Sequence, residues 1–377
     1  GKAWDASGIA YDVALWRQML RVLKPGGYLL AFGGSRTYHR LACAIEDAGF
    51  EIRDQIMWVY GSGFPKSLDV AKSMDKQAGL LAHEGKNWRN VAADTTAMVP
   101  TTKPSDYVRP EPQSESAKKW DGWGTALKPA HEPIVVARKP LVGTVAENVL
   151  TYGTGAINID GCRIGDGGQA KWAQPRGGIW ATDSDAKHAL TENTKGRFPA
   201  NLIHDGSDEV LELFPDSKGG QFPSRRGQAV NTGFASGQET VGGPRAMGDS
   251  GSAARFFYCA KANKTDRNEG LEALPVQRRA GLAGADRDGE LDAVSERWRT
   301  QPAANNHPTV KPTELMRYLV RLVVPPNGIV LDPFTGSGST GKAAMLEGAR
   351  FIGIERDEGY ARIAEARIRH AEGSTGR

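Results

Sequence analysis

The stretch that decides the fold lies near the end of the chain and reads Gly328-Ile-Val-Leu-Asp-Pro-Phe-Thr-Gly-Ser-Gly-Ser-Thr-Gly-Lys342. Its apolar run stops at Asp332, and a glycine-rich turn then leads into a helical pattern over 342–347. A second apolar run over 350–354 ends at Glu355. This order predicts a strand–turn–helix–strand unit, in which glycines allow close backbone approach and the closing acid can accept both hydroxyls of a ribose. We therefore predict a site for a cofactor that contains a nucleoside.

The spacing within this turn leaves two kinds of cofactor open. Gly336, Gly338 and Gly341 match the dinucleotide pattern GxGxxG, and Glu355 follows Gly336 by nineteen positions (355 − 336), as NAD-binding folds require. Asp332-Pro333-Phe334, however, stands where dinucleotide folds keep small apolar residues, so an acid and an aromatic ring would reach the ligand. A cofactor that binds beside an acid and an aromatic ring is therefore one possibility. NAD is the other, and the protein would then be an NAD-dependent dehydrogenase.

Two motifs resemble those of a known family. Asp332-Pro333-Phe334-Thr335-Gly336-Ser337-Gly338-Ser339-Thr340 resembles the S-adenosylmethionine motif of DNA methyltransferases that methylate exocyclic amines. Asn306-His307-Pro308-Thr309-Val310-Lys311-Pro312 is similar to the stretch that precedes this motif in the family and closes over the methionine end of the cofactor. A simpler interpretation of that stretch is a helix start with Thr313 as N-cap. The resemblance implies that the cofactor is S-adenosyl-L-methionine, bound by His307, Thr309, Lys311, Asp332, Pro333, Phe334, Gly336, Ser337, Gly338, Ser339, Thr340 and Glu355.

Composition narrows the class of protein only a little. The 377 residues suffice for a large core and two domains, and a net charge of +4 with a pI near 8.8 favours a nucleic-acid partner only weakly. No stretch is long and apolar enough for a membrane span, and no secretory signal is evident. Cys43, Cys162 and Cys259 are isolated, which fits a reducing compartment and no metal site. We expect a cytoplasmic protein, either bacterial or made by a phage in its host.

Residues 5–60 form the other clear α/β stretch. An amphipathic helix is followed by a buried strand over 28–32, a helix over 38–48 and a strand over 50–60, and another strand over 134–137 follows an insertion. In the family that the motifs resemble, a tryptophan-containing strand and a His-Glu strand form the antiparallel edge of the sheet. The resemblance therefore implies the α/β fold of a Rossmann-like class I methyltransferase, with a mostly parallel sheet, an antiparallel edge strand and an inserted target-recognition region.

The resemblance also divides the chain and places DNA contacts in two of its parts. Phe64, Pro65 and Lys66 follow an apolar strand, and their composition suits a planar base beside a phosphate. Arg225 and Arg226 lie in a glycine-rich basic tract, which predicts either contact with a phosphate backbone or a disordered surface loop. The five parts are the N-terminal half of the core (1–67), an insertion (68–127), the edge strand (128–140), the target-recognition region (141–304) and the S-adenosylmethionine-binding half of the core (305–377).

As a whole the chain resembles β-type amino-methylating DNA methyltransferases, including orphan and restriction–modification enzymes of phage and bacteria. Such enzymes activate the amine of a flipped base with a [Asp/Asn/Ser]-Pro-Pro-aromatic tetrad, whose oxygens accept its N–H bonds and localise the nitrogen lone pair. This sequence holds no such tetrad, because its one Pro-Pro pair, Pro325-Pro326, is followed by Asn327. We expect the tetrad to lie upstream of Gly1, so that no residue present is assigned as catalytic.

The resemblance implies double-stranded DNA as the substrate and leaves several readings of the activity open. Adenine N6 is the first choice of target atom and cytosine N4 the second, since the tetrad residue that discriminates them is missing. A catalytically silent DNA-binding module that retains the cofactor fold is an alternative of a different class. A homodimer or a higher oligomer is compatible with either function.

Overall fold

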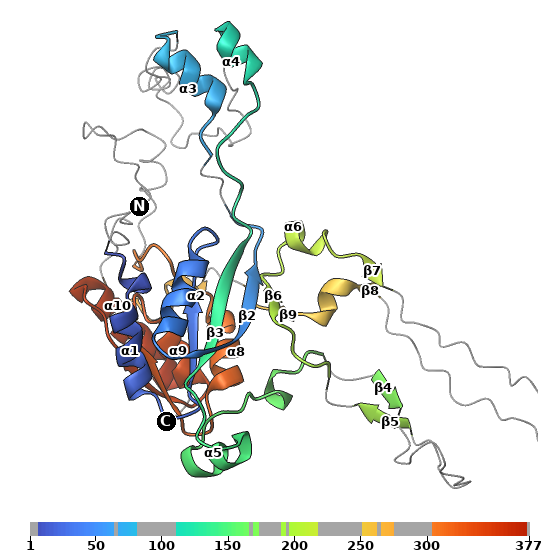
Figure 1. Ribbon diagram of the computed structural model, residues 1–377, viewed down its shortest axis with the longest axis vertical. Helices are drawn as coiled ribbons and strands as arrows, with labels where there is room; N and C mark the ends of the chain where they lie inside the picture. Colours follow the sequence, from blue (N-terminus) through green and yellow to red (C-terminus); the bar gives the residue numbers. More distant parts are fainter. Residues whose placement is uncertain are drawn as a thin grey trace, which may run out of the picture.

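The structure is a computed structural model that describes residues 7–63, 67–80, 111–165, 169–172, 190–193, 196–217, 251–261, 265–274 and 304–374. The chain is mixed α/β, with a central sheet in the order β1-β3-β2-β6-β9 (Figure 1). These strands are β1 Tyr28–Phe32, β3 His131–Arg138, β2 Glu51–Val59, β6 Leu202–His204 and β9 Tyr258–Cys259. Strand β2 is parallel to β6, and β6 is parallel to β9, so the sheet is mostly parallel as predicted.

The antiparallel strand β3 lies inside this sheet, and its predicted position at the edge is wrong. It pairs on one side with β1, where Tyr28 lies opposite Arg138, and on the other with β2, where Val59 lies opposite His131. Residues 133–138 are buried on both faces of the sheet. An apolar run that fills both faces is typical of an interior strand, because an edge strand would leave a row of its backbone N–H and C=O groups unpaired.

The side chains of β3 alternate between two hydrophobic clusters, as the period of a strand requires. Val135 and Ala137 join the cluster under helices α1 Val13–Val22 and α2 Tyr38–Asp47. Ile134 and Val136 join the cluster that contains the buried stripe of helix α8 Thr313–Val323. Helices from the two ends of the chain therefore cover opposite faces of one sheet.

The predicted unit around the glycine-rich turn is present. Strand β10 Ile329–Asp332 pairs in parallel with β11 Arg350–Gly353, and helix α9 Ser339–Leu346 connects them. The helix begins three residues earlier than the 342–347 pattern predicted, directly at the end of the turn. The final helix, α10 Glu358–Ser374, packs against α9. Val330 and Phe351 contact the same cluster as α8, so this unit shares its core with the central sheet.

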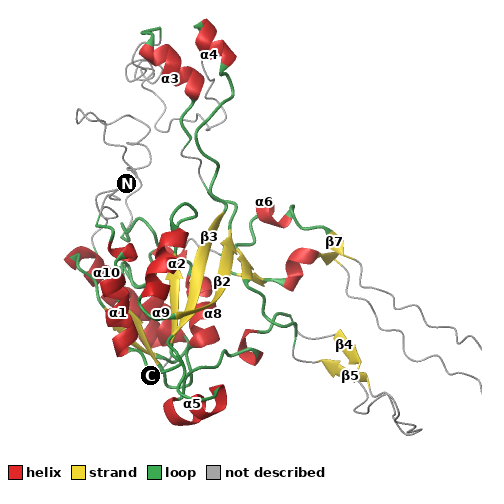
Figure 2. Cartoon of the chain, in the orientation of Figure 1, coloured by secondary structure: helices red, strands yellow, loops and turns green. Residues whose placement is uncertain are grey.

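The remaining elements surround this core. Helices α3 Val70–Gln77 and α4 Glu115–Lys119 lie side by side, and the chain leading to them extends beyond the ends of β2 and β3 (Figures 1 and 2).

Strands β6 and β9 fall within 141–304 yet belong to the central sheet; the role of that region in target recognition stays a prediction. Within the described residues, no helix combines the length and the apolar character that a membrane span needs. The other elements are η2 Ile9–Tyr11, α5 Val145–Tyr152, η4 Asp160–Cys162, β4 Gln169–Trp172, β5 Leu190–Asn193, α6 Asp208–Leu211, β7 Asp216–Ser217, β8 Gly251–Ser252, η5 Ala253–Phe256 and η6 Thr265–Arg267.

Because α8 joins the two halves of the core, we expect truncation of its buried face to destabilise the whole protein. Leu315 is 0% exposed, and Leu315→Ala should lower the free energy of unfolding by about 2–5 kcal/mol through lost burial and a residual cavity. Urea denaturation measures the difference. Leu150→Ala is the matched control, since Leu150 is 87% exposed in α5. Equal stability of the two variants would contradict this account of α8.

Candidate functional site

The turn after β10 is held by hydrogen bonds from its own backbone. The Phe334 N–H donates to Asp332 Oδ1 at 2.9 Å, and the Thr335 hydroxyl donates to the carbonyl oxygen of Asp332 at 2.9 Å. The N–H of Thr335 donates to the Ile354 carbonyl at 3.0 Å, and the N–H of Gly338 donates to the Thr335 carbonyl at 2.9 Å. Groups of the protein itself therefore fix the shape of the turn, and these N–H groups already have acceptors.

Glu355, at the end of β11, closes the other side of this turn. Its Oε2 accepts the N–H of Gly336 at 2.8 Å, and its Oε1 accepts the N–H of Asp357 at 2.9 Å. A carboxylate oxygen has two lone pairs, so each oxygen can still accept a hydroxyl. The half-buried carboxylate is thus fixed in place and keeps the acceptors that a ribose would need.

The glycines of the turn are required by neighbouring protein atoms. Gly338 has φ +78°, and a Cβ there would lie 2.8 Å from the Cα of Ala364 in α10. A Cβ on Gly336, which has φ +53°, would lie 2.8 Å from Nε2 of His307. A Cβ on Gly341 would lie 2.4 Å from Cδ1 of Ile368. The pattern that predicted close approach is therefore explained by packing of the turn against α10 and His307.

The two acids of the turn interact with each other. Burial raises the pKa of Asp332, and the nearby negative charge of Glu355 raises it further, while hydrogen bonds from Thr340 and from the Phe334 N–H oppose the shift. A cation near these carboxylates would stabilise their charged forms, and an anion would destabilise them. The turn therefore favours a ligand that carries positive charge.

His307 is the residue of the preceding motif that reaches this turn. Its ring lies against Gly336 and forms an edge-to-face contact with Tyr360 of α10, with centroids 4.6 Å apart. Its Nδ1 accepts the N–H of Thr309 at 3.3 Å. Burial lowers the pKa of His307, although the charge of Glu355 opposes the shift, so the imidazole is neutral in the folded protein at neutral pH.

Lys311 reaches the central sheet instead. It forms an ion pair with Glu132 at the start of β3, and its Nζ lies 4.7 Å from the ring centroid of Phe32 and 5.5 Å from that of Trp58. These residues lie at the ends of β1, β2 and β3, next to Tyr60, whose pKa burial and the charge of Glu132 both raise. The Nε1 donor of Trp58 is buried and has no partner among the described residues.

The predicted site residues thus fall into three groups, and their roles in binding stay predictions. Asp332, Pro333, Phe334, Gly336, Ser337, Gly338, Ser339, Thr340 and Glu355 lie at the turn, with His307 against it. Phe334 is 48% exposed and Thr309 is exposed, whereas Ser337 and Ser339 are buried. Lys311 lies with the aromatic cluster of the central sheet. The proposed DNA contacts lie outside the described residues: Phe64, Pro65, Lys66, Arg225 and Arg226.

Sequence reasoning missed a buried ionic cluster beneath the turn. Lys342 of α9 is 4% exposed and its Nζ lies 2.6 Å from Asp266 Oδ1 and 2.7 Å from Glu269 Oε2. Arg367 of α10 is 0% exposed and donates to the Ser337 carbonyl at 2.5 Å. Sequence pattern gives only a weak signal for such residues, since a lysine or arginine in an amphipathic helix is usually assigned to the solvent-exposed face.

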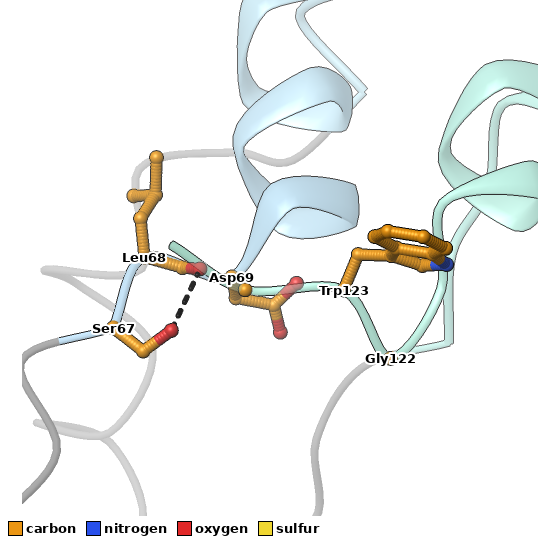
Figure 3. A pocket seen from close by; sticks show the side chains of 6 residues that line it. Ser67, Leu68, Asp69, Gly122 and Trp123 are labelled. Atoms are coloured by element: carbon orange, nitrogen blue, oxygen red, sulfur yellow. Dashed lines mark hydrogen bonds between the residues drawn. The ribbon is translucent and has the colours of Figure 1, made fainter. Parts of the chain in front are cut away.

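A separate hollow of about 220 Å³ lies beside the N-terminal end of α3, whose N-cap is Asp69 (Figure 3). The Trp123 ring lies at one side of it, and the Ser67 hydroxyl donates to the Leu68 carbonyl at 3.5 Å. None of the predicted cofactor residues lines it, so it carries no part of the candidate site. The lining residues are Ser67, Leu68, Asp69, Gly122, Trp123 and Gly124.

Comparison with known proteins gives one broad match and several local ones. The sequence profile of the family described as DNA methylase, N6_N4_Mtase, matches residues 10–366. The type II methyltransferase M2.LlaDCHI of Lactococcus lactis subsp. cremoris is 39% identical over 80 residues, which are 21% of this chain and 28% of that protein. The type II methyltransferase M.HinfI of Haemophilus influenzae is 40% identical over 74 residues, 20% of this chain and 21% of that protein. The chain therefore matches only a minor part of the length of these relatives.

Solved structures match most of the length of this chain, but they superpose on it poorly. The M1.HpyAVI–SAM complex has a TM-score of 0.33 at 13% identity, covering 94% of this chain and 81% of that one. The cytosine-N4-specific PvuII DNA methyltransferase has a TM-score of 0.37 at 11% identity, covering 94% of this chain and 68% of that one. At such low scores, family membership depends on the sequence match alone.

The lowered pKa of His307 makes the stability of the protein depend on pH. The folded state keeps the imidazole neutral, whereas the unfolded chain binds a proton as the pH falls through the ordinary value of 6.5. The stabilising contribution is therefore complete above this value and is lost toward lower pH. Replacing His307 by Asn should reduce the loss of unfolding free energy between about pH 7.5 and 5.5.

Urea denaturation at several pH values measures this dependence. His204, whose pKa burial also lowers, should retain part of it in the His307→Asn variant. The exposed His39 supplies the control, and His39→Asn should behave like the unaltered protein. An identical pH dependence for all three proteins would show that His307 is not held neutral.

Proposed function

The chain belongs to the DNA methylase family, and we propose that the turn around Asp332 and Glu355 binds S-adenosyl-L-methionine for transfer of its methyl group to an exocyclic amine of DNA. Adenine N6 is the preferred target atom and cytosine N4 the second. The substrate is double-stranded DNA with the target base turned out of the helix, since its amine is otherwise held in a base pair.

One observation carries the choice of cofactor. Two carboxylates lie at the turn: Asp332 accepts the Phe334 N–H at 2.9 Å, and Glu355 accepts the Gly336 N–H at 2.8 Å. S-adenosylmethionine carries a sulfonium and an ammonium group, which such a pair attracts, whereas the pyrophosphate of NAD would be repelled. The N–H groups of Phe334, Thr335 and Gly336 already have acceptors within the protein, so they do not form a free phosphate cradle. These features disfavour the dehydrogenase alternative.

The residues of the turn suit the parts of this cofactor. Glu355 keeps acceptor capacity for the ribose hydroxyls, and the exposed ring of Phe334 offers a face beside the purine. The Asp332 carboxylate would attract the ammonium group at the methionine end of the cofactor. When bound, S-adenosylmethionine supplies an electrophilic methyl group on sulfur, and the protein has only to hold the acceptor nitrogen in line with it.

The segment 307–311 connects the turn proposed for S-adenosylmethionine with the place proposed for the target base of DNA. His307 contacts the cofactor turn through Gly336, and Lys311, four residues later, contacts Phe32 and Trp58 at the end of the central sheet. Aromatic rings beside a charged pair can receive a planar base by stacking while the neighbouring polar groups bind its edge. We infer that the target base lies beside this aromatic cluster, with its amine directed toward the turn.

Loss of the Glu355 carboxylate should weaken cofactor binding. A hydrogen bond to a charged group contributes about 1.5–3 kcal/mol, so Glu355→Ala should raise the Kd for S-adenosylhomocysteine about 10- to 100-fold. Isothermal titration calorimetry measures the change, and NAD should bind neither protein. Glu365→Ala is the control, because Glu365 is an exposed acid of α10 that pairs with Arg369. Binding of NAD in place of S-adenosylhomocysteine would overturn the proposal.

These 377 residues should bind the cofactor without methylating DNA. The chemistry needs two acceptors for the N–H bonds of the amine, and the sequence holds no Pro-Pro-aromatic tetrad to provide them. Transfer of tritiated methyl groups to unmethylated double-stranded DNA should therefore stay at the background level, while S-adenosylhomocysteine still binds. Multiple turnovers by this chain alone would show that another residue activates the amine.

A further inference from the structure

Residues 265–271, which we call the brace, begin with η6 and contact the start of α8 through Asp266. The Asp266 Oδ2 accepts the N–H of Thr313 at 2.7 Å, and its Oδ1 accepts the Thr313 hydroxyl. Thr313 is the first residue of α8, so the helix is capped by an acid that lies 47 positions earlier in the chain (313 − 266). A negative charge at a helix N-terminus satisfies free N–H groups and interacts favourably with the helix dipole.

The same carboxylate joins the brace to the helix that follows the cofactor turn. Lys342 Nζ lies 2.6 Å from Asp266 Oδ1 and 2.7 Å from Glu269 Oε2, so two acids of the brace surround one buried lysine of α9. Burial by itself would raise the pKa of Asp266, but hydrogen bonds from Lys342 and Thr313 outweigh it and hold the pKa below its ordinary value. Asp266 is therefore ionised at neutral pH, and its pairing offsets the cost of burying both charges.

Arg367 of α10 connects the brace with the turn itself. Its Nη2 donates to the carbonyl oxygen of Asp266 at 3.2 Å, and its Nη1 donates to the carbonyl oxygen of Ser337 at 2.5 Å. The same Nη1 lies 3.2 Å from the Ser337 hydroxyl and 3.3 Å from that of Ser339. One fully buried guanidinium thus fixes the backbone of the turn relative to the brace, while Lys342 fixes the helix after it.

Arg267 holds the other side of the candidate site. Its guanidinium donates to the carbonyl oxygens of Asn305, at 3.3 Å, and of His307. The buried Asn305 returns a hydrogen bond from Nδ2 to the Arg267 carbonyl at 2.9 Å and accepts the His307 N–H at 3.1 Å. The position of the His307 ring against Gly336 therefore depends on the brace as well.

The brace is itself fixed against α10. Gly270 has φ +81°, and a Cβ there would lie 2.6 Å from the Cβ of His370. Leu271 is 1% exposed, and Glu269 lies 3.5 Å from His370 Nε2. A segment that is packed on one side and bonded to α8, α9 and His307 on the other has little freedom to shift without moving them.

We propose that the brace positions the cofactor site, with Asp266 and Arg267 as positioning residues that fix Ser337 and His307. Both act from beneath the turn, through Lys342, Arg367 and Asn305. The proposal depends on the function proposed above, since it takes S-adenosylmethionine as the ligand of the turn. A turn that is held in its binding geometry before the ligand arrives loses less freedom on binding, and affinity rises accordingly.

The test compares two buried aspartates that make similar bonds. Asp266→Asn keeps the shape of the side chain and removes its charge, and we expect the Kd for S-adenosylhomocysteine to rise about tenfold. Asp75→Asn is the matched control, because Asp75 is 1% exposed and accepts the N–H of Ser114 at 2.9 Å and its hydroxyl at 2.6 Å, at the start of α4. It should leave the Kd unchanged even if it lowers the stability by a similar amount.

Two further measurements separate positioning from a general loss of stability. In the protein without ligand, amide exchange of Gly336 and Gly338 should be faster in Asp266→Asn than in Asp75→Asn. Combining Asp266→Asn with Lys342→Met removes both charges of the Asp266–Lys342 pair, so the double variant should lose less affinity than the sum of the single variants. An unchanged Kd with unchanged amide exchange in Asp266→Asn would overturn the proposal.

Failure of a variant to fold and failure of the proposed function give distinguishable results. If circular dichroism shows that Asp266→Asn is unfolded, Arg267→Lys replaces it; this variant keeps the charge but donates from one nitrogen, and it should also bind more weakly. Full affinity in Arg267→Lys would then overturn the proposal. If the unaltered protein binds no S-adenosylhomocysteine, the proposed function fails, while the amide exchange of the turn still decides whether the brace fixes it.

Discussion

The structure depends on helix α8, whose apolar face is shared by two sheets. Among the described strands, β10 pairs only with β11 and β1 pairs only with β3, so no strand pairing joins the β10–α9–β11 unit to the central sheet. Leu315, Leu319 and their neighbours pack against both at once. Hydrophobic packing has no direction of its own, so polar contacts on either side of α8 must fix the angle between the two units.

Those polar contacts lie at the start of α8 and also build the candidate site. The segment that leads into the helix contacts the turn through His307 and the central sheet through Lys311, and Asp266 caps the helix from outside. Burying the charges of Asp266, Lys342 and Arg367 would be costly if any were unpaired, and each finds partners only when α8, α9 and α10 are assembled. The ionic cluster therefore favours one arrangement of α8, α9 and α10. Apolar packing alone would specify the angles between these helices less strictly.

Much of the core could be predicted from the sequence, because its signals are local. The apolar runs that became β1, β10 and β11 alternate with turn residues at the expected spacing. The interior position of β3 was harder to predict from the sequence, since strand order depends on pairings between distant segments. The simpler interpretation of Thr313 as an N-cap is wrong: Pro312 occupies the cap position and Thr313 is the first residue of α8. The carboxylate that accepts the Thr313 N–H comes from Asp266, and no spacing rule links residues so far apart.

The brace also bears on how the chain can be divided. By sequence, residues 141–304 look like an insertion between two halves of a core, with weak periodicity and many glycines. Within that range, however, β6 and β9 extend the central sheet, Asp266 pairs with Lys342 after the glycine-rich turn, and Arg267 donates to the His307 carbonyl. A part of the chain that supplies both sheet strands and buried charges to the core is not an independent module. If DNA contacts in this range shift the brace, they must also change the affinity for the cofactor, and the cofactor must change the affinity for DNA by the same factor.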